Sequence, residues 1–214
     1  MTKDELISAT EMTSELAERW YYPLMATMEA CGIDTPLRQS HFLAQTGAES
    51  AGFRIIKESL NYSVDGLKIF GPRLSIEQRE RYGRKPGEPA LSSERQAEIA
   101  RLVYGGRYGN NYQDDGWKYR GRGLKQITFR NNYIACSEAL GLDLEKNPDL
   151  LLTELNAAFS AGWFWQANNC NSFADNDDIL NLSRRINGGF NGLNERTRRT
   201  IKAKETLLSL IRNG

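Results

Sequence analysis

The chain has 214 residues, of which 40% are hydrophobic and 26% charged, so it is long enough for one globular domain with a sizeable core. Its 28 lysines and arginines nearly balance its 27 aspartates and glutamates, which removes any whole-chain electrostatic argument for nucleic-acid binding. Three cysteines without a CxxC pair and a single histidine, His41, favour neither a disulfide framework nor a zinc site. We therefore predict no metal and no cofactor.

The first helix is predicted to begin at the amino terminus, where Thr2 and Glu5 have the spacing of a capping box. An apolar stripe at spacings of four, from Leu16 onward, extends this helical prediction to about Ala30. We expect one continuous helix over this region, with its apolar face in the core.

A second helix is predicted from Thr35–Pro36, an N-cap residue followed by proline at the first helical position. It places Gln45 and Glu49 one turn apart on one face, and Gly52 is expected to end it. Glu49 then lies in the last turn, where the partial negative charge of the helix end disfavours an ionised carboxylate.

Glycines and prolines recur over about residues 59–116, which we interpret as an inserted small lobe with long loops. Beyond it, the run Tyr119–Thr128 predicts a tight turn or small hairpin. The remaining predicted helices cover Ser92–Tyr104, Asn131–Leu140, Thr153–Trp165, Asp177–Ile186 with Asp177 as its cap, and about Asn194–Arg212. The predicted fold class is mainly α, with little or no β structure.

Two glutamates are distinguished by their neighbours and their spacing. Glu49 lies among small uncharged residues that can line a cleft, and Glu58 follows nine residues later, past a glycine turn. Two carboxylates so placed can face each other across a groove, which is what glycoside cleavage requires. Such pairs also occur by chance, so the pattern alone leaves a two-carboxylate glycosidase as one hypothesis among several.

Several segments in chain order resemble motifs of the family 19 glycoside hydrolases, which include plant-type chitinases and phage endolysins. The run His41–Phe53 resembles the catalytic helix of the family, and Glu58–Tyr62 resembles the second-carboxylate motif of its endolysin branch. The other similar segments are Tyr119–Thr128 with Asn132–Tyr133, Asn147–Leu150, Trp163–Trp165, Ile186–Gly189 and Gly192–Arg196. The resemblance spans about residues 15–205 and implies a lysozyme-like, family 19 chitinase-like α-helical domain.

This sequence departs from the family pattern at two positions. Ala48 stands where the family often has histidine, which leaves the following acid without a polar neighbour. Lys125 stands where an apolar residue or proline is common, and we expect it to add positive charge to the groove.

The resemblance implies a role for each matching residue. Glu49 is the general acid and Glu58 the general base of a single displacement with inversion, which needs about 6.5–9.5 Å between the carboxyl groups. Thr128 helps to hold the attacking water or the acyl group of the sugar. The implied substrate-binding residues are Gln126, Asn132 and Asn187 as hydrogen-bonding amides, Tyr119 as an aromatic face, and Arg196 as partner of a groove carboxylate.

Simpler structural roles stay open for some of these residues. Thr128 and Asn132 could cap the helix that follows them. His41 is interpreted as a hydrogen-bonded structural residue rather than a catalyst. The basic residues of the last predicted helix are interpreted as the solvated face of a helix packed on the core, rather than as a surface for anionic envelope polymers: Arg196, Arg198, Arg199, Lys202, Lys204 and Arg212.

The predicted function is an endolysin of muramidase type, which hydrolyses the β-1,4 bond between N-acetylmuramic acid and N-acetylglucosamine in bacterial peptidoglycan and so lyses a host cell. The alternatives are a chitinase, a lytic transglycosylase and a non-catalytic glycan-binding module. The lack of a secretory signal, a disulfide set and a chitin-binding cysteine module favours the endolysin.

The expected partners are peptidoglycan glycan strands, with no nucleic acid, no stable membrane insertion and a monomeric state. We expect residues 1–214 to form a single catalytic domain without a separate wall-binding domain. The protein would be made in the host cytoplasm and would act on the cell wall in the periplasm after release.

Overall fold

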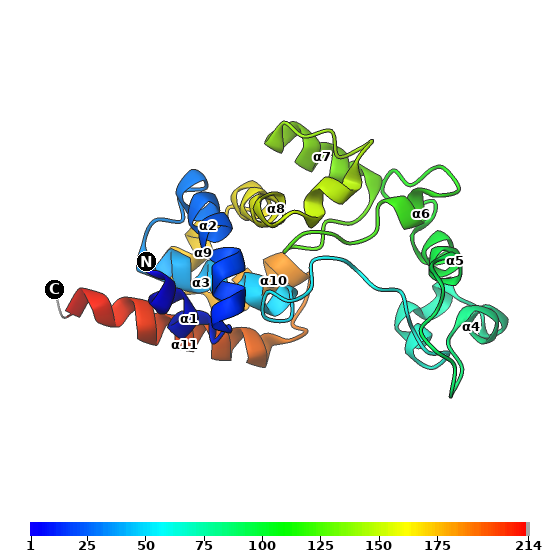
Figure 1. Cartoon of the computed structure of the whole chain (residues 1–214), viewed down its shortest axis with the longest axis horizontal. Coiled ribbons are helices and arrows are strands. Elements are labelled where there is room, and N and C mark those ends of the chain that lie inside the picture. Colours follow the sequence, from blue (N-terminus) through cyan, green and yellow to red (C-terminus); the bar gives the residue numbers. More distant parts are fainter. Residues whose placement is uncertain (213–214) are drawn as a thin grey trace. The chain divides into compact units, whose positions relative to one another are not determined.

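The computed structural model describes the backbone of residues 1–212 and the side chains of residues 1–209, so the Arg212 side chain lies outside the described residues. Helices are the main regular structure of the described chain, and long loops join some of them (Figure 1). Its β structure is limited, over residues 1–212, to isolated bridges such as the one between Arg122 and Ile127. The predicted mainly α fold class is therefore confirmed.

The chain folds into two compact units. Unit 1 comprises residues 1–56, 123–126 and the described residues from 149 onward, and unit 2 comprises residues 57–122 and 127–148. The predicted inserted lobe at about 59–116 lies inside unit 2. The expectation of one catalytic domain without a separate wall-binding domain stays a prediction.

Unit 1 contains most of the longer helices. They are α1 (Lys3–Thr10), α2 (Ser14–Ala30), α3 (Pro36–Glu49), α8 (Glu154–Ala167), α9 (Cys170–Asp175), α10 (Ile179–Asn187) and α11 (Leu193–Arg212). Unit 2 contains η1 (Gly66–Arg73), α4 (Ile76–Tyr82), α5 (Ser93–Tyr104), α6 (Asp115–Lys118) and α7 (Arg130–Leu140), and η2 (Pro148–Leu152) begins at its last residue.

The prediction of one continuous helix to about Ala30 is wrong. The first helix ends at Thr10, because Glu11 adopts a left-handed conformation with φ of 57°. Thr13 then accepts a hydrogen bond from the backbone N–H of Leu16 and begins a second helix. The sequence signal for this break was the Thr13 cap, which the apolar stripe of the following helix obscured.

The expected cap of helix α10 is also corrected by one residue. The side chain of Asp178, not that of Asp177, accepts from the backbone N–H of Asn181. Asp177 instead accepts a hydrogen bond from His41 and pairs with Lys204. Asp178 therefore caps α10, whereas the adjacent Asp177 links α3 to α11.

The core of unit 1 gathers around large aromatic side chains. Trp20 is fully buried and its indole N–H donates to the Phe53 carbonyl over 2.9 Å. Phe42 of α3 meets Trp165 of α8 edge to face, with ring centroids 5.4 Å apart. These contacts join α3, the helix that carries Glu49, to α8, and they join the turn that follows α3 to α2.

Basic residues of α11 are paired with acidic groups inside unit 1. Arg198 contacts Glu11 and Glu195, Arg199 lies 2.8 Å from Glu195, and Lys204 contacts Asp177. These pairs favour the interpretation of α11 as a helix packed on the core. Over the part of the chain that the structure describes, no helix combines the length and apolarity needed to cross a lipid bilayer.

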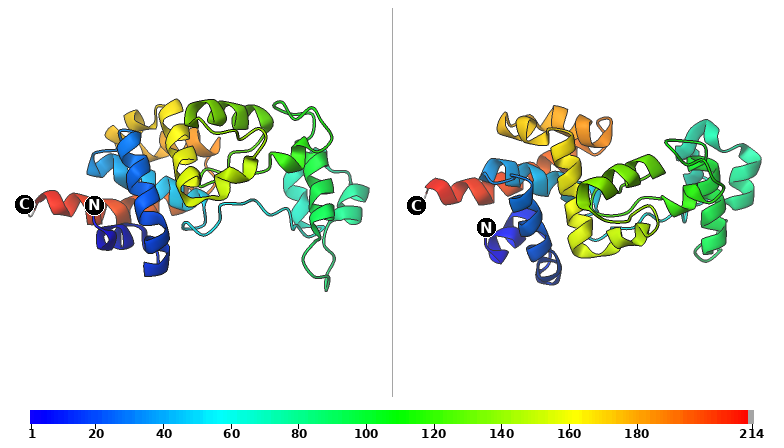
Figure 2. Two further views of the ribbon diagram at one scale, coloured as in Figure 1. Left: turned by 45° about the horizontal axis from the view of Figure 1, so that its top comes forward. Right: turned by 90° about the horizontal axis from the view of Figure 1, so that it is seen from above.

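Helix α8 packs closely beside α2 at Gly162 (Figure 2). A Cβ atom at Gly162 would lie 2.5 Å from Thr27 Cγ2 and 2.6 Å from Cys31 Sγ. We predict that Gly162→Val lowers the unfolding free energy by about 2 kcal/mol, the usual scale of overpacking. Thermal unfolding followed by circular dichroism measures this.

The matched control is Gly189→Val, because no heavy atom lies within 4 Å of a Cβ at that position. The control should leave the midpoint of thermal unfolding close to that of the parent protein. Equal midpoints for both variants would contradict the close approach of α2 and α8.

Candidate active site

The two glutamates singled out by the sequence belong to different units. Glu49 lies in unit 1 and Glu58 in unit 2, so each is described with its own surroundings. In both cases both carboxylate oxygens contact a partner within the same unit.

Helix α3 presents Glu49 as its last helical residue, in agreement with the predicted end of the helix. The helix begins as expected, because Thr35 accepts from the backbone N–H of Arg38 and Pro36 opens the first turn. After Glu49 the chain reverses: the Gly52 N–H donates to the Gly47 carbonyl over 2.7 Å, with Gly52 at a φ of 71°. This tight turn leaves the carboxylate at the end of α3.

Two cations contact the Glu49 carboxylate. The Arg196 guanidinium of α11 donates to Oε1, and the Lys125 ammonium donates to Oε2 over 3.0 Å. The Glu49 side chain is 12% exposed, so solvent screens these contacts only in part. The expected effect of the helix end on the ionisation of Glu49 stays a prediction.

The Arg196 guanidinium is itself held in place. It donates over 2.7 Å to the Gln45 side-chain oxygen, and the Gln45 amide donates over 3.1 Å to the Ser183 hydroxyl of α10. Arg196 and Gln45 are both buried. The sequence placed Arg196 with a carboxylate of the groove, and the structure brings it to Glu49. The sequence alone did not predict that Gln45 holds Arg196, although the spacing of Gln45 and Glu49 already placed both on one face of the helix.

The other two predicted site residues of unit 1 are Gln126 and Asn187, and the side-chain amide of each donates to a nearby backbone carbonyl. Gln126 donates from its amide to the Gly123 carbonyl over 3.0 Å and has a φ of 59°. Asn187, the last residue of α10, is exposed and donates to the Asn191 carbonyl over 3.1 Å. Their predicted hydrogen bonds to N-acetyl sugars stay predictions.

Glu58 in unit 2 is held by neutral donors. The Tyr104 hydroxyl donates to Oε1 over 2.5 Å, and the Gly121 N–H donates to Oε2 over 2.9 Å. The Glu58 N–H donates in turn to the Gly121 carbonyl over 2.8 Å. An antiparallel bridge between Lys57 and Arg122 continues this pairing. The backbone beside Glu58 is therefore fixed in register with the glycine-rich turn.

Tyr104 is a functional candidate that the sequence did not identify. Burial, with the negative charge of Glu58 as the next cause, raises the pKa of Tyr104 far above its ordinary value. The hydroxyl thus keeps its proton and remains a donor. The ring is wedged edge to face against Phe70 and Phe129, with centroid distances of 6.3 and 5.4 Å. No local pattern signals a contact between residues 46 positions apart.

The structure speaks against the capping alternative for Thr128 and Asn132. Helix α7 begins at Arg130, and its N-cap residue is Phe129, whose side chain makes no capping hydrogen bond. The Arg130 N–H donates instead to the side chain of the buried Asn110 over 2.9 Å. The exposed Asn132 donates back to the Thr128 carbonyl over 2.8 Å.

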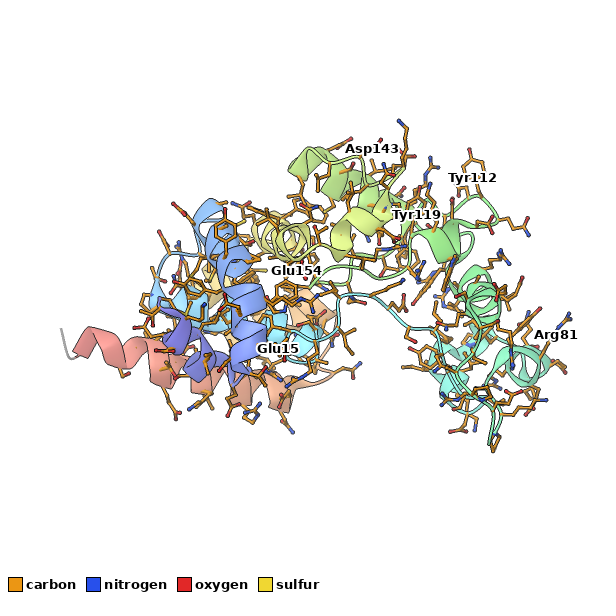
Figure 3. The ribbon with its side chains drawn as sticks, in the orientation of Figure 1. Glu15, Arg81, Tyr112, Tyr119, Asp143 and Glu154 are labelled. Carbon is orange, nitrogen blue, oxygen red and sulfur yellow. The ribbon has the colours of Figure 1, made fainter. Side chains whose placement is uncertain are left out.

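Tyr119 does not present the expected aromatic face. Its side chain is 2% exposed, and its ring packs on Tyr133 with centroids 5.3 Å apart (Figure 3). The hydroxyl donates to the Glu145 carbonyl over 3.0 Å. The structure therefore corrects this assignment: Tyr119 is a core residue of unit 2, because its ring and its hydroxyl are both used internally.

Comparison with known proteins places this geometry in a family. The family model described as chitinase class I matches residues 96–181. A Haemophilus influenzae protein named as a glycosyl hydrolase family 19 domain-containing protein is 39% identical over 184 residues, which cover 82% of this chain and 83% of that protein.

Two further matches concern the fold and a short segment of the sequence. The crystal structure of a bacterial family 19 chitinase has a TM-score of 0.61 at 20% identity, covering 96% of this chain and 94% of that one, which confirms the lysozyme-like fold. A Hevea brasiliensis protein named as an inactive chitinase-like protein is 51% identical over 51 residues, 23% of this chain and 16% of that protein. Identity over a short segment therefore does not establish catalytic activity in this chain.

The buried His41 on α3 gives a testable dependence of stability on pH. Its Nε2 lies 2.8 Å from Asp177 Oδ1, as expected for a hydrogen-bonded structural residue. Burial lowers the pKa of His41, and the hydrogen bond to Asp177 opposes this only in part. An unfolded histidine has a pKa of about 6.5. The contribution of the neutral imidazole is therefore present above that pH and is lost as the pH falls toward and through the folded-state pKa.

We predict that the unfolding midpoint falls between pH 7.5 and pH 5 in the parent protein, and that the fall is smaller in His41→Gln. Thermal unfolding of both proteins over this range measures the difference in slope. Parallel curves would show that His41 does not carry the effect.

Proposed function

The chain belongs to glycosyl hydrolase family 19, and we propose that it hydrolyses the β-1,4 bond between N-acetylmuramic acid and N-acetylglucosamine in bacterial peptidoglycan, as an endolysin. The observation that carries the proposal is that both motif glutamates, Glu49 and Glu58, have built surroundings in which each carboxylate oxygen is engaged. Glutamates are seldom buried unless they are paired, and the Glu49 side chain, which is only 12% exposed, is paired at both oxygens.

The surroundings support Glu49 as the general acid. When it gives its proton to the glycosidic oxygen, the C–O bond breaks and Glu49 becomes a carboxylate. Arg196 and Lys125 then stabilise the charge that develops on it. Such contacts are stronger in the transition state than with a neutral acid, which is the condition for accelerating a reaction.

The surroundings of Glu58 support its role as the general base. A tyrosine hydroxyl and a backbone N–H hold its two carboxylate oxygens, and a carboxylate oriented in this way can accept a proton from water. That water attacks the anomeric carbon on the face opposite the leaving group and inverts its configuration. Thr128 would hold this water or the acyl group of the sugar, and Gln126, Asn132 and Asn187 would hydrogen-bond the N-acetyl sugars.

Two observations support peptidoglycan as the substrate. The segment Glu58–Tyr62 resembles the endolysin branch, and Lys125 brings a positive charge to the acid in place of the apolar residue common in the family. The match to the chitinase class I family favours a second candidate function, hydrolysis of N-acetylglucosamine polymers. We further propose that the protein is a monomer that is made in a bacterial cytoplasm and reaches the wall after release.

Hydrolysis of purified peptidoglycan, compared with that of chitin oligomers, tests the proposal. We expect new reducing ends from peptidoglycan and little product from chitin. Glu49→Gln and Glu58→Gln should each lower the rate by about 10²–10⁴-fold, since each removes a proton-transfer group while keeping its shape. Muropeptide mass spectrometry identifies the products.

The control variant is Glu29→Gln, which changes an exposed glutamate at the end of α2. It should retain parental activity. Cleavage of chitin but not of peptidoglycan would reverse the substrate assignment. Products with anhydromuramic ends would identify a transglycosylase, and binding without cleavage would identify a glycan-binding module.

The role of Tyr104 yields a second prediction. Tyr104→Phe removes a hydrogen-bond donor that holds Oε1 of the Glu58 carboxylate. We expect kcat to fall by about 10-fold with little change in KM, because the base is less well oriented toward the water. Tyr112→Phe is the control, because its side chain projects outward from the loop before α6 (Figure 3). A parental kcat in Tyr104→Phe would show that Tyr104 is only a packing residue.

A further inference from the structure

Lys125 lies on a short turn, residues 123–126, whose backbone is fixed within unit 1. The Gly123 N–H donates to the Ile56 carbonyl over 2.8 Å, and the Leu124 N–H donates to the Ala157 carbonyl over 3.2 Å. Leu124 is fully buried. A Cβ at Gly123 would lie 2.5 Å from the Ser160 hydroxyl, so the turn sits directly on α8. The Cα of Lys125 therefore has a defined position from which its side chain reaches Glu49.

The Lys125 side chain is largely buried. It is 16% exposed, and its ammonium lies 4.7 Å from the centroid of the Phe164 ring. Its stem borders a small pocket that is otherwise mostly apolar, with Phe42, Trp165 and Ile186 in the lining. An ammonium in such a place is costly unless it is paired, and Glu49 supplies the negative charge.

The two cations on Glu49 are held differently. Arg196 is buried and is fixed by its second bond, to Gln45. Lys125 binds the other carboxylate oxygen through a four-carbon stem and is the more exposed of the two. Of the pair, Lys125 is the cation whose contact can change without disturbing the buried network.

Other charged groups also face the end of α3 within unit 1. Arg199 of α11 lies close to Gly47 and Gly52, with guanidinium nitrogens 3.3 and 3.5 Å from Cβ positions built on them. The Arg54 guanidinium donates to the Ala51 carbonyl over 3.3 Å. On α8 and α10 the uncharged Phe164 and Ser183 contact Lys125 and Gln45, respectively. Arg199 is itself paired with Glu195 of α11, whereas Lys125 is the cation in contact with Oε2 of Glu49.

We propose that Lys125 is a positioning residue that orients Oε2 of Glu49 and stabilises the carboxylate that forms once the proton has been transferred. The inference rests on the proposed role of Glu49 as general acid. When Glu49 gives its proton to the glycosidic oxygen, negative charge develops on Oε2, which lies 3.0 Å from the Lys125 ammonium. A contact that strengthens as this charge develops favours the transition state over the bound substrate.

The test compares Lys125→Met, which keeps an unbranched apolar stem beside Phe164, with Lys125→Arg, which keeps the charge. For Lys125→Met we expect kcat to fall by about 10²-fold with little change in KM, the lower end of the cost of removing one donor to a developing negative charge. Lys125→Arg should retain most of the parental kcat, since it keeps a cation beside Oε2.

Lys146→Met is the matched control, because that side chain is 82% exposed in unit 2. Circular dichroism establishes that each variant is folded. A parental kcat in Lys125→Met, or a fall in kcat that Lys125→Arg shows to the same extent, would overturn the proposal.

Inactivity of the parent protein on both glycans would contradict the proposed function instead, and this outcome is distinct from either result for Lys125.

Discussion

The sharing of the Glu49 carboxylate between Arg196 and Lys125 is the interaction on which the rest of unit 1 depends. It joins three segments that are remote in sequence: the end of α3, the start of α11 and the turn at residues 123–126. Removing the Glu49 carboxylate would leave two largely buried cations without their common partner, which is costly in a protein interior. The buried Gln45 and Ser183 extend the network to α10, so the position of the acid is determined by helices rather than by loops.

Unit 2 holds its glutamate by different means. Glu58 is bound by a tyrosine hydroxyl and a backbone N–H, which are neutral donors, whereas Glu49 is bound by two cations. This difference agrees with distinct roles for the two groups. A general acid gains negative charge as it reacts, so contacting cations assist it, while a general base loses negative charge and would be impeded by them.

Local signals in the sequence predicted the elements that depend on local physics. The Thr35 cap and the glycine turn after Glu49 located helix α3 correctly, because capping and helix ending are decided within a few residues. The ion pair of Arg196 with a carboxylate was anticipated only through family resemblance. The bonds of Glu49 to Lys125 and Arg196 join residues 76 and 147 positions apart, and no periodicity reports such contacts. Tyr119 was misassigned for the same reason, since burial of its ring is a tertiary property.

The anomeric configuration of the newly formed reducing end tests the central claim most directly, because that claim is a single displacement with Glu49 as acid and Glu58 as base. Proton NMR spectra of peptidoglycan fragments, recorded in the first minutes of digestion before mutarotation, distinguish the two anomers. The account predicts that the α anomer appears first from the β-linked substrate. Initial release of the β anomer would indicate a double displacement and would contradict it.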